Sequence, residues 1–154
     1  MAVFAVPLAM AYSLIRLLHL GMLLILAGAV VIENIATKPV ISNEDARNLA
    51  TVDRVAGISA VLTLALGLIL WLAVGKPPEF YSDNPLFHAK VGAFFLLITL
   101  ASYPAVFFFK HRSSAAEEIA VPKTVLLLLK AELLLLLVIP VMAYLMARGV
   151  GLSP

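Results

Sequence analysis

The side chains best suited to chemistry in this sequence are ionisable groups that stand inside long apolar stretches. They come in three pairs: Arg16 with His19, His88 with Lys90, and Lys130 with Glu132. An ionised side chain at the centre of a bilayer costs about 2.5–3.5 kcal/mol on insertion scales. Residues kept in such places despite that cost are the first candidates for a functional site.

The first pair, together with Lys90, predicts a cofactor site. His19 is expected near the middle of its apolar stretch, where an imidazole can be an axial ligand of haem iron. Arg16 lies three residues earlier on the same helical face, and Lys90 is expected at a similar depth on another helix. Both cations suit haem propionates. We therefore expect His19, Arg16 and Lys90 to bind haem b, with His19 as the metal ligand. The alternative is a hydrogen-bonded bundle histidine beside a lysine that extends its ammonium to the interface.

The other two pairs are expected to be split by the turn of the helix. Two residues rotate an α-helix by about 200°, so His88 and Lys90 face opposite sides, and so do Lys130 and Glu132. Both Lys130 and Glu132 are expected to be buried polar groups. Glu132 is expected close to the midplane, where a carboxyl without a partner is protonated. We expect it to have a buried partner: Lys90, Arg16 or a polar group of the first helix. Its role is either proton transfer or, slightly favoured, a contact between helices.

The elements that must position these residues are four apolar blocks. The chain is 63% hydrophobic and 13% charged, whereas a soluble domain is about half apolar and a quarter charged. The blocks cover about residues 9–33, 52–74, 85–109 and 122–147, each long enough to cross about 30 Å of hydrocarbon. The predicted fold is all-α: a polytopic bundle of four transmembrane helices forming one integral membrane domain, residues 1–154.

Local signals mark where the blocks begin and end. Asn84 suits an N-cap and Pro85 a first helical position. Ser42 or Asn43 can cap a helix before the second block, so an early start on the membrane surface stays open for that helix. Asp53, which follows, is a further polar group expected to be buried. It shares a helical stripe with small residues, among them Gly67, that permit close helix contact.

The basic residues predict the orientation. Six of the eleven flank the first and third loops, while two lie on the opposite side: Lys38, Arg47, Arg54, Lys110, Arg112 and Lys123 against Lys76 and Arg148. Basic residues favour the cytoplasmic side. We therefore expect a multi-pass protein of the bacterial inner membrane with both termini outside the cytoplasm. We expect the first block to be retained rather than cleaved as a signal peptide, because no basic residue precedes Arg16 and the apolar run is too long.

Several stretches resemble a known family. "ARNLATVDRVAGISA", "FYSDNPLFHAKVGAFF", "SYP" and "KAELLLLLVIPVMAYLMARG" look like the uncharacterised bacterial membrane-protein family called domain of unknown function 2214. The resemblance covers most of the chain. This chain has Leu70 where the family tends to carry Arg near the end of the second helix. More distantly, it is similar to four-helix proteins of the copper-resistance D type and to the membrane haem-containing protoporphyrinogen oxidase. That resemblance implies a haem-ligating role for His19 and a role in activity for Lys90.

The function expected from the residues and the resemblance is haem binding in the bundle and membrane redox chemistry, with no reaction assigned. The alternative is a non-catalytic accessory or structural subunit, or part of an oligomeric transporter. The lipid bilayer is the expected partner, with a second copy of the chain or a membrane redox protein as further partners. Nothing indicates nucleic acid, and the chain has no cysteine for a disulfide or an iron–sulfur cluster.

Overall fold

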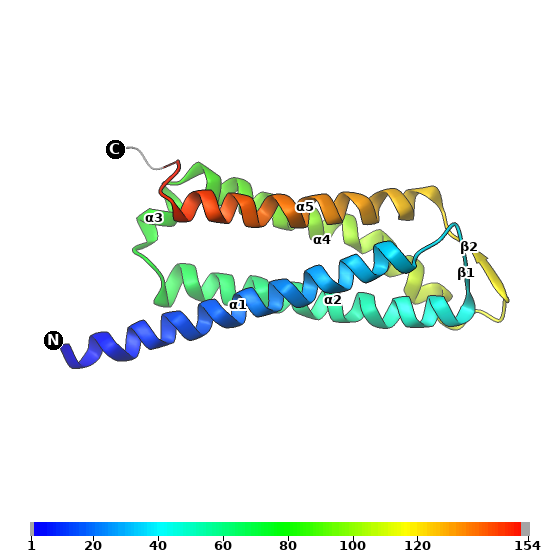
Figure 1. Ribbon diagram of the computed structural model, residues 1–154, viewed down its shortest axis with the longest axis horizontal. Coiled ribbons are helices and arrows are strands. Elements are labelled where there is room, and N and C mark those ends of the chain that lie inside the picture. Colours follow the sequence, from blue (N-terminus) through cyan, green and yellow to red (C-terminus); the bar gives the residue numbers. More distant parts are fainter. Residues whose placement is uncertain (1, 152–154) are drawn as a thin grey trace.

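The computed structural model describes residues 2–151, with side chains described for Pro7 and for residues 9–151. Four long helices form its body: α1 (Ala2–Ala36), α2 (Asn43–Ile69), α4 (Pro85–His111) and α5 (Lys123–Ala147). Each contains a stretch long and apolar enough to cross a membrane. The helices run alternately in opposite directions (Figure 1). The predicted all-α bundle of four membrane-spanning helices is confirmed.

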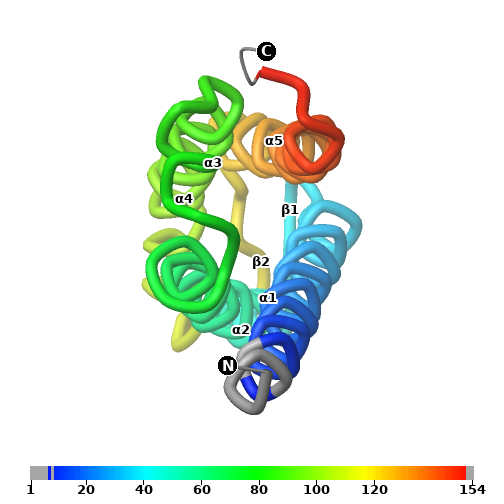
Figure 2. Tube along the Cα trace, turned by 90° about the vertical axis from the view of Figure 1, so that its left-hand side faces the viewer, coloured from blue at the N-terminus to red at the C-terminus, as the bar shows by residue number. Residues whose placement is uncertain are grey.

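The four helices stand at the corners of the bundle (Figure 2). α1 and α4 each contact both α2 and α5, so α1 and α4 are diagonal to each other. We call the end where α1 begins and α5 ends the termini end, and the opposite end the sheet end. α1 crosses the bundle obliquely: it lies on α2 toward the termini end and reaches α5 toward the sheet end (Figures 1 and 2).

The helix starts follow the predicted caps. The Ser42 side chain accepts a hydrogen bond from the Asp45 main-chain N–H, and the Asp45 carboxylate accepts one from that of Ser42. This capping box satisfies main-chain groups that a helix end leaves free. It starts α2 at the early position that the sequence left open. Asn84 caps α4 and also donates to the Val150 carbonyl at 3.0 Å, which ties the start of α4 to the chain after α5.

Four short elements were not predicted. α2 continues as a π-helical segment, η1 (Leu70–Val74), and a single turn, α3 (Pro78–Ser82), lies before α4. At the sheet end, β1 (Val40–Ser42) pairs antiparallel with β2 (Glu118–Ala120). Ile41 and Ile119 face each other in this pair and are buried. The sheet therefore closes the bundle end with apolar side chains.

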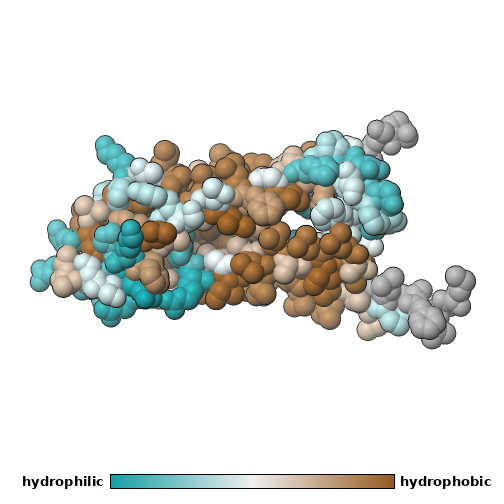
Figure 3. Space-filling model, turned by 180° about the vertical axis from the view of Figure 1, so that it is seen from behind, coloured by the Kyte–Doolittle hydropathy of each residue, from teal (hydrophilic) through white to brown (hydrophobic). Residues whose placement is uncertain are grey.

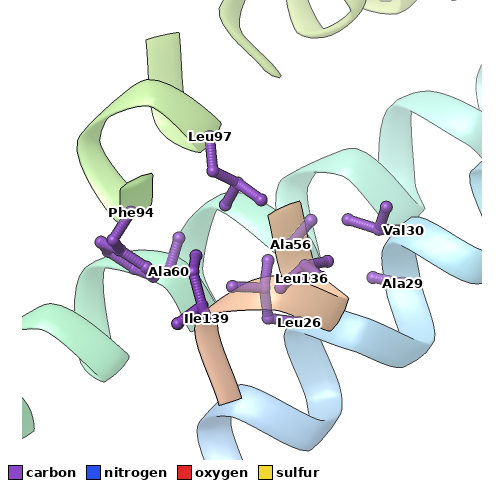
Figure 4. Close-up of a cluster of buried hydrophobic side chains, with 9 residues drawn as sticks. All are labelled: Leu26, Ala29, Val30, Ala56, Ala60, Phe94, Leu97, Leu136 and Ile139. Carbon is purple, nitrogen blue, oxygen red and sulfur yellow. The ribbon is translucent and has the colours of Figure 1, made fainter. Parts of the chain in front are cut away.

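The core has two apolar layers. The middle core joins all four long helices (Figure 4): Leu26, Ala29, Val30, Ala56, Ala60, Phe94, Leu97, Leu136 and Ile139. The sheet-end core joins the two strands to α2, α4 and α5: Ile41, Ala46, Leu49, Ala50, Phe108, Ile119, Val121, Val125 and Leu129. No buried side chain occurs on α1 between residues 9 and 25, so the apolar core lies toward the sheet end.

The outer surface matches a bilayer. On the face seen in Figure 3, hydrophobic residues cover the middle of the molecule and hydrophilic residues gather toward its ends. Large apolar side chains such as Leu24, Leu72 and Leu134 are exposed on the outer surface. An apolar surface of this extent is stable in contact with lipid rather than water.

Candidate functional site

His19 lies on α1 and packs against α2. Its side chain is half-buried, and its Nδ1 is 2.9 Å from the main-chain oxygen of Thr63. A carbonyl oxygen only accepts hydrogen bonds, so in this bond Nδ1 carries the hydrogen and donates it. The neutral ring then has its lone pair on Nε2, which is the atom available to a ligand.

Gly67 makes room for this imidazole. A Cβ added at Gly67 would stand 3.2 Å from Cε1 of His19, closer than ordinary van der Waals contact. The absence of a side chain at Gly67 therefore lets the ring lie directly on α2. The small-residue stripe predicted for this helix includes Gly67, and here it accommodates a side chain as well as the neighbouring helix.

Lys90 approaches His19 from the diagonal helix. Its side chain is half-buried, and its charge lies close enough to act on the His19 ring. The Lys90 Nζ is also 5.2 Å from the centre of the Phe87 ring. Because α1 and α4 are diagonal, this influence acts across the bundle interior. Two of the three predicted site residues, His19 and Lys90, are thus half-buried and on the same side of the middle core.

Arg16 lies at the surface, about one helical turn from His19 toward the termini end. Its side chain is exposed, and its Nη1 is 3.5 Å from the Tyr12 hydroxyl. Its charge also acts on Tyr81, which precedes α4. Arg16 therefore stands at the rim of the region that contains His19 and Lys90, rather than inside it.

Aromatic side chains line this region. The buried Phe87 ring packs edge-on against Trp71 of η1, with ring centres 4.9 Å apart, and against Tyr81 at 5.5 Å. The Trp71 Nε1 is buried and has no partner in the described part of the chain. Single turns of π-helix often occur at functional sites, and η1 begins at Leu70, next to Trp71.

Tyr81 lies on the single helical turn α3. Its hydroxyl accepts a hydrogen bond from the Lys76 main-chain N–H at 3.4 Å. Burial raises the pKa of its phenol, so the group stays neutral across the physiological range. It offers the site a hydroxyl and no charge.

Two of the other predicted positions face away from the interior. His88 is exposed and its Nε2 is 2.7 Å from the Ser82 carbonyl, so it lies on the opposite side from Lys90, as predicted. Lys130 is also exposed, and the expectation that it is buried is wrong. The reason is the helical rotation of about 200° that separates it from the buried Glu132.

The remaining predicted polar residues lie toward the sheet end. Glu132 is 1% exposed and Asp53 is half-buried. The charges that act on each other here belong to Asp53, Glu132 and a third carboxyl, Glu33. The Oε1 of Glu132 has no partner among the residues described. No ion pair with Lys90 or Arg16 occurs in the described chain, so that expected pairing is wrong. Glu33, a polar group of the first helix, is close enough for the two charges to interact but makes no hydrogen bond to this oxygen.

Glu33 is a buried residue that was not among the site residues expected from the sequence. It is 2% exposed, although it stands near the end of α1. One signal was available: Glu33 follows His19 by fourteen residues, which returns it to nearly the same helical face. The oblique path of α1 toward α5 buries it.

The described residues do not form a metal site built from protein side chains alone. No group of three or more His, Asp and Glu side chains is placed to hold a metal ion within residues 9–151. A group that brings its own ligands, such as a porphyrin, needs only one or two axial ligands from the protein. His19, with Nε2 free, meets that requirement.

These features define an integral membrane protein: a four-helix bundle with a half-buried histidine and a half-buried lysine on diagonal helices. The chain belongs to the family described as predicted membrane protein (DUF2214), whose model matches residues 11–151. Comparison with curated proteins and with solved structures found no match.

Proposed function

We propose that this chain is a bacterial inner-membrane protein that binds haem b in the termini half of its bundle and takes part in membrane redox chemistry. His19 is the proposed axial ligand. Lys90, and Arg16 at the rim, are the proposed partners of the propionates. The distant resemblance to copper-resistance D proteins and to the haem-containing protoporphyrinogen oxidase belongs to this proposal.

The observation that carries the proposal is the bond from His19 to the Thr63 carbonyl. Histidines that bind metals commonly donate their other ring N–H to a carbonyl or carboxylate, which fixes the tautomer and the ring orientation. Here the bond is 2.9 Å long and Gly67 holds the ring against α2. The imidazole is therefore oriented before any ligand arrives.

Two further features support a planar apolar ligand with acidic substituents. Between residues 9 and 25, α1 has no buried side chain, so the apolar core does not extend along this part of the helix. Lys90 supplies a half-buried cation whose charge acts on His19, and Phe87 and Trp71 supply apolar ring surface beside Lys90. When bound, haem would supply reversible one-electron chemistry.

The test is the absorbance spectrum of the purified full-length chain and three variants. Wild type from haem-replete cells should show a Soret band. His19→Ala should abolish it, because that change removes the proposed ligand. Lys90→Ala should retain the band but weaken haem binding about tenfold, since a charge-assisted hydrogen bond is lost. His88→Ala is the matched control and should leave the spectrum unchanged, because His88 is exposed and bonded to Ser82.

Wild-type protein without a Soret band would contradict the proposal. The rival expectation, a non-catalytic accessory subunit or a transporter component, would then stand. Retention of the band in His19→Ala, with its loss in His88→Ala, would show that the ligand is His88 and that the proposal names the wrong histidine. Thermal unfolding of the haem-free protein separates these outcomes from a folding defect in a variant.

A further inference from the structure

Three carboxyl side chains from three different helices lie at a similar level in the half of the bundle nearer the sheet end. Glu33 comes from α1, Asp53 from α2 and Glu132 from α5, and their charges act on one another. Glu33 and Glu132 are 2% and 1% exposed, whereas Asp53 is half-buried. We call these three residues the acidic layer.

The acidic layer lies between the two apolar cores. On α2, Asp53 stands between Ala50 of the sheet-end core and Ala56 of the middle core. On α5, Glu132 stands between Leu129 of the sheet-end core and Leu136 of the middle core. The layer is therefore a polar section within a hydrophobic interior. On α5, the core residues one turn before and one turn after Glu132, Leu129 and Leu136, are both buried.

Two oxygens of the layer lack a hydrogen-bond donor. The Oε1 atoms of Glu33 and Glu132 are buried and have no partner within the described residues. A buried polar atom left unsatisfied costs about 1–3 kcal/mol, and more when it is charged. The side-chain amide of Asn34, the residue that follows Glu33, donates instead to the carbonyls of Val30 and Leu129 at 3.0 and 2.8 Å.

None of the surrounding helices supplies a cation from its described residues. The α4 face that packs at this level carries Leu97 and Pro104, both buried. Arg54, next to Asp53, and Lys130, near Glu132, are both exposed. Three carboxylates without a cation would repel one another strongly in a medium of low dielectric constant.

We propose that Glu33, Asp53 and Glu132 form a proton-binding site inside the membrane, in which a bound proton supplies the missing donor. A carboxylic O–H on one side chain can donate to an unpartnered oxygen of its neighbour, and it removes one of the repelling charges. The carboxyls of the described chain do not form a metal-binding group. Asp53, the partly exposed member, is the point of exchange with the surroundings. This inference does not depend on haem.

The test is infrared difference spectroscopy of the full-length protein in lipid vesicles. At about pH 7 exposed carboxyls are ionised, because their pKa values lie near about 4. Any signal of a protonated carboxylic acid at that pH must come from buried groups. Wild type should show this signal and lose it on alkaline titration. Glu33→Gln and Glu132→Gln should each remove part of it, and the double variant should remove it completely. Glu44→Gln, at an exposed position on α2, is the control and should retain it.

Absence of the acid signal from wild type at about pH 7, or its persistence in the double variant, would overturn the proposal. Loss of the signal on adding Na⁺ or K⁺ at constant pH would also overturn it, because the layer would then bind a metal cation.

If a variant fails to fold, wild type can be treated with a hydrophobic carbodiimide, which reacts with protonated carboxyls. Mass spectrometry should then find the adduct on Glu33 or Glu132, and modification of neither would contradict the proposal. None of these measurements requires haem, so a failed Soret test leaves them unaffected.

Discussion

The His19 imidazole can lie against α2 because residue 67 is a glycine and has no methyl group at that contact. A Cβ at Gly67 would stand 3.2 Å from the ring, whereas a Cβ at Gly57, on the same helix, would meet no described atom within 4 Å. Replacing Gly by Ala inside a helix gains up to about 1 kcal/mol when the methyl has room. The two glycines therefore differ in what an added methyl does.

We expect Gly57→Ala to keep or raise stability, and Gly67→Ala to be less stable than Gly57→Ala by about 1 kcal/mol. Gly67→Ala should also displace the His19 ring from the Thr63 carbonyl. Denaturant unfolding in detergent measures the first effect, and the imidazole nitrogen chemical shifts in NMR report the second. Equal stability with unchanged shifts would show that the ring does not depend on Gly67.

The burial and facing of single residues could be predicted from the sequence where they depend only on the apolar stretches and on the rotation of the helix. His19 and Lys90 stand out as ionisable groups in apolar stretches, and the rotation between neighbours correctly separated His88 from Lys90. Glu33 was on a suitable face, but its position near the end of α1 made exposure the simpler expectation. Its burial depends on the tilt of α1 toward α5, which no local pattern encodes.

The secondary-structure elements depend on caps that were visible in the sequence. Asn84 and Pro85 start α4, and Ser42 starts α2. The β1–β2 pair was not predictable, because three residues are too few to show an alternating pattern. The strands pair because the loops that follow α1 and precede α5 meet at the sheet end, and that meeting is a property of the assembled bundle.

The capping box at the start of α2 gives a direct test at this level. Ser42→Ala removes the side-chain acceptor for the Asp45 N–H and should lower the free energy of unfolding by about 1 kcal/mol. Ser113→Ala is the matched control, because Ser113 is an exposed loop serine. Denaturant titration in detergent compares the two. Equal stability of both variants would mean that lipid and tertiary packing hold the start of α2 without the cap.

The whole bundle is divided along its length. The sheet half contains most of the apolar packing together with the acidic layer, and the termini half contains His19, Lys90 and the aromatic residues around Phe87. The oblique path of α1 causes this division, since α1 packs on α2 at one end and reaches α5 at the other (Figure 2). Because the two sites share α1, fourteen residues apart, a tilt of this helix would move both of them.

The orientation of the molecule in the membrane is the last prediction. Lys38, Lys110, Arg112 and Lys123 lie at the sheet end, whereas Lys76 and Arg148 lie toward the termini end. Basic residues near the ends of membrane helices favour the cytoplasmic side. A C-terminal alkaline phosphatase fusion should therefore be active, and a green fluorescent protein fusion at the same place should be dark. Insertion of each reporter between Ser113 and Ser114 should give the opposite pattern. The reverse result would place the acidic layer nearer the outer face and require its protons to exchange with the periplasm.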